Sequence, residues 1–137
     1  MAKKISGYFI LSDSYYCLHI TGWVDDPMSY VELFDVACLL SRWEGFGLAL
    51  PEYMMAGKPI VASRVDAIPN IIRDGKNGLL VEVDDDAGAS NAVLRIYQED
   101  GLKDKLVTHG FEDVHNRFNI RRVSEEHGKL FEKYAEE

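Results

Sequence analysis

Cysteine is one of the residues in which this chain is poor. Its two cysteines, Cys17 and Cys38, lie in the apolar runs "YYCLHI" and "VACLL", and this setting favours buried free thiols over a disulfide or a metal-binding pair. Long apolar runs are absent as well, since none approaches the ~20 residues of a membrane span. Residues 1–14 also make a poor signal peptide. We therefore expect a cytoplasmic protein that is not an integral membrane protein.

Positive charge is scarce too. The chain has 15 Lys and Arg against 23 Asp and Glu, a net charge of −8. This balance argues against a nucleic-acid partner, because a phosphate backbone requires a basic face. A few local donors still suffice for a small phosphorylated ligand. The histidines show no metal-ligating spacing, and structural or surface roles are expected for His19, His109, His115 and His127.

Short apolar runs alternate with helical patterns along the 137 residues, which predicts an α/β fold of Rossmann-like, three-layer type. We expect one domain over residues 1–137 with a mostly parallel sheet of four or five strands. The expected strands are 17–22, 35–41, 59–64 and 78–83, with 8–12 as a further candidate. The expected helices are 26–34, opened by Asp26 and Pro27, then 47–56, a short one within 66–75, and a helical extension of 86–99, 102–115 and 120–134.

The stretch "SRWEGFGLALPEYMMAGKP" (41–59) places Gly45 and Gly47 between an apolar strand and a helix. Glycines let a ligand approach the main chain, and a helix start offers unpaired N–H groups with a partial positive charge. In an open parallel sheet, ligands bind beyond the carboxyl ends of the strands. This turn is therefore predicted to hold a phosphate-bearing ligand.

Two carboxylates, Glu44 and Glu52, flank the turn. A carboxylate accepts two hydrogen bonds at once, and a vicinal diol of a sugar or ribose offers two donors. Together with phosphate donors, they suit a nucleoside diphosphate that carries a sugar. An alternative interpretation needs no ligand: Glu44 is a solvated loop residue and Glu52 a surface helix residue.

A rival function uses the same residues. "GFGLAL" is part of the G-x-G-x-x-G dinucleotide fingerprint, and Asp66 follows about 20 residues later. Leu50 stands where the third glycine is expected, although that glycine permits close packing of helix and strand. The rival also leaves Glu44 without a purpose.

The spacing E-x7-E, from Glu44 to Glu52, resembles the signature of the group 1 (family 4) retaining glycosyltransferases. The run "ITGWVDDPMSYVELFDVACLLSRWEGFGLALPEYMMAGKPIVAS" and the later "DGKNGLLVEVDD" are similar to the same family. The resemblance is close over residues 17–83 and loose over the helical tail, 86–137.

The resemblance implies the nucleotide-sugar-binding C-terminal half of a GT-B enzyme that transfers a hexosyl group from a UDP-, GDP- or ADP-sugar. By analogy Glu44 is the catalytic-site residue that contacts hydroxyls of the transferred sugar, and Glu52 holds the ribose. The backbone of Gly45, Phe46, Gly47 and Leu48 meets the sugar and its diphosphate. The family implies no metal and no further cofactor.

The chain departs from the family's pattern in three places. The first βα unit, whose Arg and Lys grip the diphosphate, has no counterpart before Cys17. Residues 66–70 replace a stretch that usually carries a glycine pair and a glutamate, and the acceptor-binding N-terminal domain is missing. We therefore expect an inactive isolated chain that needs a separate N-terminal domain, and weak self-association through an uncovered sheet edge. A truncated, non-catalytic nucleotide-binding or interaction module is the alternative function.

Other residues near the turn have simpler explanations. The run Asp84–Asp86 resembles the metal-binding D-x-D of other glycosyltransferases, but a capping aspartate before a helix explains it more simply. Two interpretations of Arg42 stay open, contact with the anion or a salt bridge to a nearby carboxylate. Trp23 is expected in the core, and Phe46 either packs under the bound sugar or closes the loop.

Overall fold

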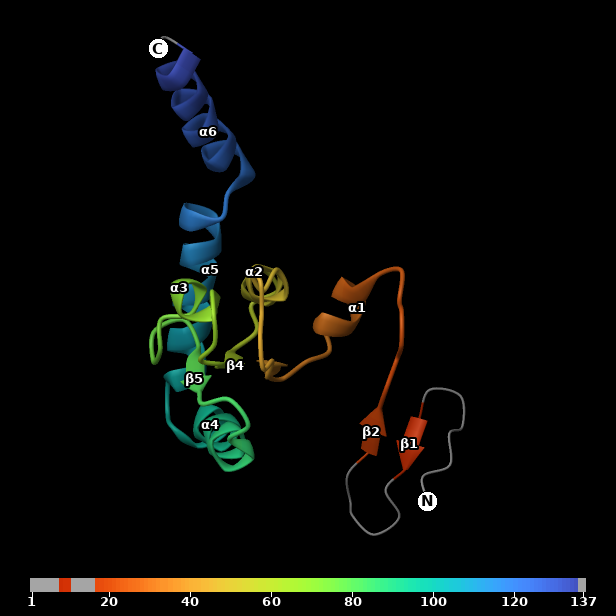
Figure 1. Ribbon diagram of the computed structural model, residues 1–137. Coiled ribbons are helices and arrows are strands. Elements are labelled where there is room, and N and C mark those ends of the chain that lie inside the picture. Colours follow the sequence, from red (N-terminus) through yellow and green to blue (C-terminus); the bar gives the residue numbers. More distant parts are fainter. Residues whose placement is uncertain (1–7, 11–16, 136–137) are drawn as a thin grey trace.

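The computed structural model describes residues 8–10 and 17–135. In chain order these residues form β1 (Tyr8–Ile10), β2 (Cys17–His19), α1 (Pro27–Val31), β3 (Ala37–Leu39), α2 (Ala49–Met55), β4 (Ile60–Ser63), α3 (Ile68–Ile71), β5 (Leu79–Val81), α4 (Asp86–Gln98), α5 (Leu102–Arg117) and α6 (Ile120–Ala135) (Figure 1). The three helices expected after residue 85 are therefore confirmed as α4, α5 and α6.

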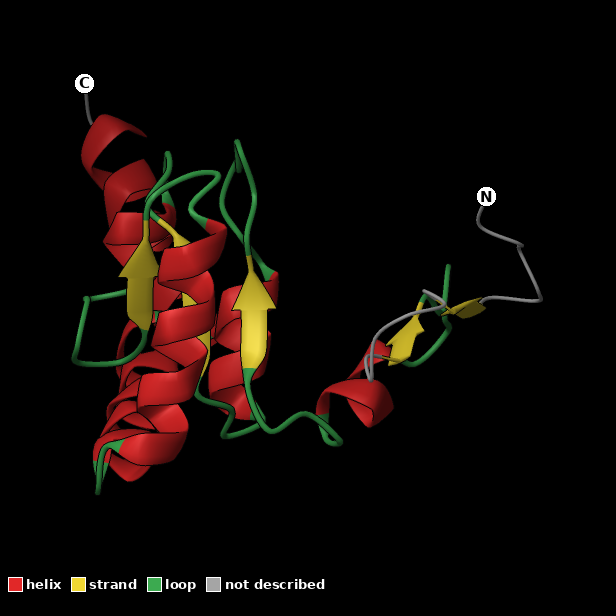
Figure 2. Ribbon diagram, turned by 90° about the horizontal axis from the view of Figure 1, so that it is seen from below, coloured by secondary structure: helices red, strands yellow, loops and turns green. Residues whose placement is uncertain are grey.

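A parallel sheet with the order β3-β4-β5 forms the centre of the molecule (Figure 2). Ala37 is in register with Ile60, and Val61 with Leu79. All four residues of the middle strand β4 are buried, as expected for a strand covered on both faces.

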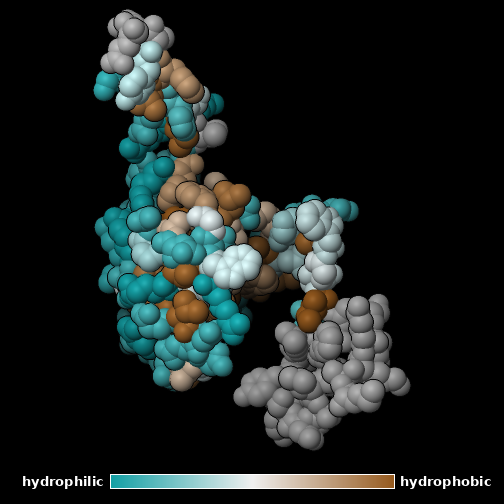
Figure 3. Space-filling view, in the orientation of Figure 1, coloured by the Kyte–Doolittle hydropathy of each residue, from teal (hydrophilic) through white to brown (hydrophobic). Residues whose placement is uncertain are grey.

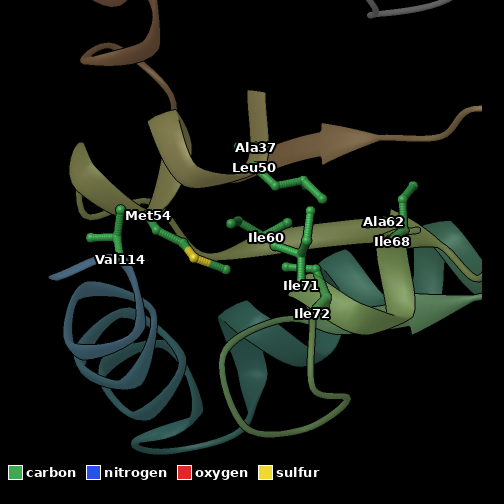
Figure 4. Close-up of a cluster of buried hydrophobic side chains, with 9 residues drawn as sticks. All are labelled: Ala37, Leu50, Met54, Ile60, Ala62, Ile68, Ile71, Ile72 and Val114. Carbon is green, nitrogen blue, oxygen red and sulfur yellow. The ribbon is translucent and has the colours of Figure 1, made fainter. Parts of the chain in front are cut away.

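Helices cover both faces of this sheet, so the expected three-layer arrangement is confirmed. On one face α2, α3 and the end of α5 pack on β3 and β4, as Figure 4 shows for the cluster Ala37, Leu50, Met54, Ile60, Ala62, Ile68, Ile71, Ile72 and Val114. On the other face α4 and the start of α5 cover Val61, Leu79 and Val81. The central strand contributes side chains to both clusters.

The predicted number of strands in the parallel sheet is wrong for the described residues, which place three there. The segment expected as the first parallel strand forms β2 over Cys17–His19, but it pairs antiparallel with β1 in a separate sheet. An apolar run predicts a strand without naming its partner, because antiparallel pairing satisfies the same backbone groups. In Figures 1 and 2, β1, β2 and α1 stand beside the main body rather than in its layers.

Two side chains expected in the core lie at the surface. Trp23 is 95% exposed, because the segment between β2 and α1 does not pack on the sheet. Cys38 is exposed on the edge strand β3, next to Ala37 and Leu39, which point to the opposite face with the α2 cluster. Partial desolvation of its sulfur still raises the pKa of the Cys38 thiol. The side chain of Cys17 lies outside the described residues.

Two helix caps predicted from aspartates are confirmed. Asp26 accepts the N–H of Ser29 at 3.4 Å at the start of α1, with Pro27 as the first helical residue. Asp85 accepts the N–H of Gly88 at 2.8 Å at the start of α4. Each cap satisfies a backbone donor that the helix itself leaves unpaired.

The last helix, α6, leads away from the sheet (Figure 1). It carries exposed Leu130, Phe131 and Tyr134, and Figure 3 shows brown side chains among the teal ones along this helix. Within the described ranges, no helix is both long enough and apolar enough to cross a membrane.

Candidate functional site

The predicted site lies where expected, at the carboxyl end of the parallel sheet. Residues 40–48 connect the end of β3 to the start of α2. The first helical turn contains Glu52, and its N-cap residue, Leu48, makes no side-chain cap. The loops that follow β4 and β5 leave the sheet at the same end, because parallel strands share their direction.

The two glycines of the loop occupy different surroundings. Gly47 has a φ of 79°, and a Cβ there would lie 3.2 Å from Leu50 Cδ1 and 3.5 Å from Glu44 Cγ. The fold itself therefore requires glycine at this position. A Cβ on Gly45 would meet nothing within 4 Å, so the described part of the protein leaves the space beside this residue open.

The two glutamates are positioned by different elements. Glu44 is partly buried in the loop, where the Ser41 hydroxyl donates to its carboxylate at 3.4 Å. Glu52 is exposed on the first turn of α2. Both therefore lie at the carboxyl end of β3, one in the loop and one on the helix that follows it.

Asp66 makes a contact that the sequence interpretation missed. Its carboxylate accepts the backbone N–H of Glu44 at 2.8 Å, which joins the loop after β4 to the loop after β3. Its φ of 45° lies in the left-handed region. The dinucleotide hypothesis instead took Asp66 as the acidic residue that follows the glycine fingerprint. A local signal did exist, since aspartate tolerates the left-handed conformation better than most residues, but nothing local identified Glu44 as the partner.

Arg42 forms the salt bridge that was one of its two interpretations. Its Nε lies 2.8 Å from Asp84 Oδ1, and both side chains are exposed. The hydrogen bond that Arg42 donates to Asp84 raises the pKa of the Arg42 guanidinium. The next arginine at this end, Arg64, contacts Asp74 at 3.0 Å and Glu82 at 3.2 Å. The positive charges of these loops are thus already paired with carboxylates.

The loop is also tied to the end of α5. The Phe46 ring meets the Phe118 ring edge to face, with centroids 6.3 Å apart, and Phe118 packs against the core cluster on the α2 face. Phe46 stays 47% exposed. The interpretation that Phe46 closes the loop therefore has direct support, and the exposed part of the ring remains accessible to a ligand.

The site is open rather than enclosed. A cavity of about 60 Å³ lies under the loops, lined by Leu40, Ser63, Glu82 and Asp84 among others. Small-molecule pockets usually measure roughly 300–1,000 Å³, so this space is too small for a nucleotide. Across the part of the chain that is described, no three His, Cys, Asp or Glu side chains gather closely enough to hold a metal ion.

The sequence profile of the family described as "Glycosyl transferases group 1" matches residues 11–99. Among curated proteins, the phosphatidyl-myo-inositol mannosyltransferase of Mycobacterium leprae is 36% identical over 121 residues, which cover 86% of this chain and 32% of that protein. The chain spans about a third of the length of the first curated relatives that it matches.

Solved structures agree with this match. The sucrose-phosphate synthase of Thermosynechococcus elongatus has a TM-score of 0.72 at 29% identity, over 79% of this chain and 27% of that one. The C-terminal domain of a group 1 glycosyl transferase from Francisella tularensis has a TM-score of 0.65 at 28% identity, over 72% of this chain and 52% of that one.

Anabaena HepE, solved with UDP and glucose, shares the fold with a TM-score of 0.71 at 18% identity, over 76% of this chain and 29% of that one. The family match includes the whole segment 17–83 that carries the resemblance and continues into the helical tail. The chain belongs to the group 1 glycosyltransferases.

Proposed function

We propose that this chain is the donor-binding half of a glycosyltransferase and holds a nucleoside diphosphate sugar at the turn Gly45–Leu48. One observation carries the proposal: the turn at the carboxyl end of the sheet combines an open space beside Gly45 with carboxylates on both sides. Anabaena HepE, which shares this fold, binds UDP and glucose. This makes UDP the first nucleotide to test, before GDP and ADP.

The proposed roles follow from the chemistry of each group. Glu52 accepts hydrogen bonds from the ribose hydroxyls, and Glu44 accepts them from the transferred sugar at the reacting end. Backbone N–H groups of Gly45–Leu48 face the diphosphate and stabilise it as it leaves. Transfer with retention of configuration at the sugar is part of the proposal.

Catalytic turnover requires a second domain that faces this turn and encloses the site. The turn lies on an open surface, and the arginines beside it are paired with Asp84, Asp74 and Glu82. We infer that an acceptor-binding N-terminal domain completes the site, because the relatives are about three times as long as this chain. The rival dinucleotide function is not favoured, since Asp66 is engaged with Glu44.

Binding by the 137-residue chain tests the proposal. A ligand that binds only the folded state raises the melting temperature, so we expect UDP, GDP or ADP to stabilise the chain. Glu52→Ala should weaken binding at least about tenfold, because a charge-assisted hydrogen bond contributes roughly 1.5–3 kcal/mol. Isothermal titration measures the dissociation constant.

Glu125→Ala is the matched control, since Glu125 is also an exposed helical glutamate but lies on α6. It should bind as the parent does. Equal binding by the parent and by Glu52→Ala would show that the role of Glu52 is wrong. If none of the three nucleotides stabilised the parent chain, the proposed function would fail.

A further inference from the structure

We propose that Asp66 is the positioning residue of the donor site and fixes the main chain at Glu44 through its carboxylate. The inference rests on the proposed function for its ligand, but the contact itself stands on geometry alone. The bond runs from the N–H of Glu44 to Asp66 Oδ2 at 2.8 Å and spans 22 residues of sequence. It connects the loops that follow two neighbouring parallel strands.

Few other contacts hold the middle of the Glu44 loop. Residues 40–48 contain no helix or strand. The side-chain contact from Ser41 to Glu44 is long, at 3.4 Å, and the Phe46 ring contact acts two residues further on. Among the described contacts, the hydrogen bond to the Asp66 carboxylate therefore acts directly on the main chain of Glu44.

Asp66 itself sits on a rigid frame. Val65 packs against the core cluster, and the Ile68 side chain is fully buried. Between them Asp66 adopts a φ of 45°, a left-handed conformation that is strained for most non-glycine residues. A residue in this conformation, held between the partly buried Val65 and the buried Ile68, presents its carboxylate in one place, which precise positioning of a neighbouring group requires.

The contact also bears on which part of the donor lies beside Glu44. The Asp66 carboxylate accepts the main-chain N–H of Glu44, a residue that carries a second carboxylate, and the Arg42 guanidinium is paired with Asp84. Negative charge repels phosphate and accepts hydroxyl donors. The uncharged, hydroxyl-rich sugar is thereby directed to the Glu44 side of the turn, and the diphosphate to the side of Gly47 and Leu48.

Three variants of the 137-residue chain separate the effects of the acceptor, the charge and the backbone strain of Asp66. Asp66→Asn keeps a side-chain acceptor and tolerates a positive φ, but it has no charge. Asp66→Gly relieves the backbone and removes the acceptor, whereas Asp66→Ala removes the acceptor and keeps the strain. The matched control is Asp74→Ala, since Asp74 also accepts a backbone N–H, from Leu80 at 2.9 Å, at the β5 edge.

Amide hydrogen exchange of Glu44, followed by NMR without ligand, measures the positioning. We expect exchange at least about fivefold faster in Asp66→Gly and Asp66→Ala, as for the loss of one hydrogen bond. Asp66→Asn should restore slow exchange to within about threefold of the parent, and Asp74→Ala should leave it unchanged. Unaltered exchange at Glu44 in both the Gly and the Ala variant would overturn the proposal.

Titration with UDP and UDP-glucose then links position to binding. The Gly and Ala variants should bind UDP-glucose at least about fivefold more weakly than the parent, with a smaller loss for UDP, which lacks the sugar. Asp66→Asn should restore sugar-dependent affinity. Equal losses for both ligands would contradict the assignment of the sugar to this side. Failed rescue by Asn would contradict the positioning role, which requires only the side-chain acceptor. If no form bound either ligand while exchange at Glu44 responded as expected, the proposed function would fail and the positioning role would stand.

Discussion

Gly45 and Gly47 are separated by one residue, yet the structure explains the presence of glycine differently at the two positions. Gly47 has a left-handed backbone and close neighbours in Leu50, Glu44 and Leu39. Gly45 has neither a positive φ nor a neighbour within 4 Å of its missing Cβ. A glycine that the fold does not need is most simply explained by something outside the described residues that approaches its main chain.

Alanine substitutions distinguish the conformational role of Gly47 from the role of Gly45 in ligand approach. Gly47→Ala should lower the free energy of unfolding by about 1 kcal/mol or more, because alanine is strained at a positive φ. Gly45→Ala should leave stability within about 0.5 kcal/mol but weaken UDP-sugar binding, since the added methyl group fills the open space. Denaturant unfolding and isothermal titration measure the two effects. Binding that survives Gly45→Ala unchanged would remove this residue from the site.

At the scale of elements, a buried carboxylate anchors α5 to the loop between α3 and β5. Asp113 is 6% exposed and accepts hydrogen bonds from Asn77 Nδ2, at 2.6 Å, and from the Arg73 guanidinium. Arg117, one turn along α5, lies 3.6 Å from the same carboxylate and donates to the carbonyl oxygen of Asn70. The next residue, Phe118, contacts Phe46 of the candidate site, so α5 connects this network to the loop between β3 and α2.

Asp113→Ala should destabilise the fold by roughly 2–3 kcal/mol, because the buried Asn77 amide and the Arg73 guanidinium both lose the carboxylate to which they donate. Thermal or denaturant unfolding measures this loss. Glu99→Ala provides the comparison, since it removes the exposed Arg95–Glu99 pair at the end of α4 and should lower the free energy of unfolding much less than Asp113→Ala does. Similar losses in the two variants would mean that the Asp113 network does not anchor α5.

At the scale of the whole molecule, the proposed function makes this chain one wall of a two-domain cleft. Closing two domains holds donor and acceptor in attacking geometry and excludes water. The described residues provide the proposed donor turn, but the arginines nearest to it are engaged with carboxylates. Each preorganised hydrogen-bond donor that is lost from an active site commonly lowers the reaction rate about 100- to 1,000-fold.

We therefore expect the isolated chain to transfer no sugar to an acceptor at a useful rate, with slow donor hydrolysis as the upper limit. An assay with a panel of nucleotide sugars and simple acceptors measures this. Multiple turnovers of glycoside product, abolished by Glu44→Ala, would contradict the expectation and show that the 137 residues suffice for catalysis.

The two edges of the parallel sheet differ in protection. At β5 the Asp74 carboxylate accepts a hydrogen bond from the outward-facing N–H of Leu80. At β3 no strand among the described residues pairs with the outer edge, where Cys38 is exposed. An uncovered edge strand is a template for pairing with another chain, so weak self-association at high concentration remains our prediction.

Sedimentation velocity over a range of concentrations tests this association. Cys38→Lys should reduce it, because a charged side chain on an edge strand opposes pairing, whereas Cys38→Ser should not. A parent chain that sediments as a monomer at every concentration would rule the association out.

Local sequence patterns predicted the elements from α1 to α6 and the glycine turn between β3 and α2. These features depend on local signals: capping by Asp26 and Asp85, and glycines between a strand and a helix. Such signals act over a few residues and are visible in any stretch that contains them. That residues 1–137 form one domain, and that Glu44 and Glu52 contact the donor, stay predictions.

The contacts between distant groups followed from the packing of the chain and from no local pattern. This packing paired β2 with β1 instead of the parallel sheet, and it left Trp23 exposed. It also joined Asp66 to Glu44 across 22 residues and Asn77 to Asp113 across 36. A strand pattern or a carboxylate specifies the kind of bond that it forms but not its partner, because that choice depends on the packing of the whole chain.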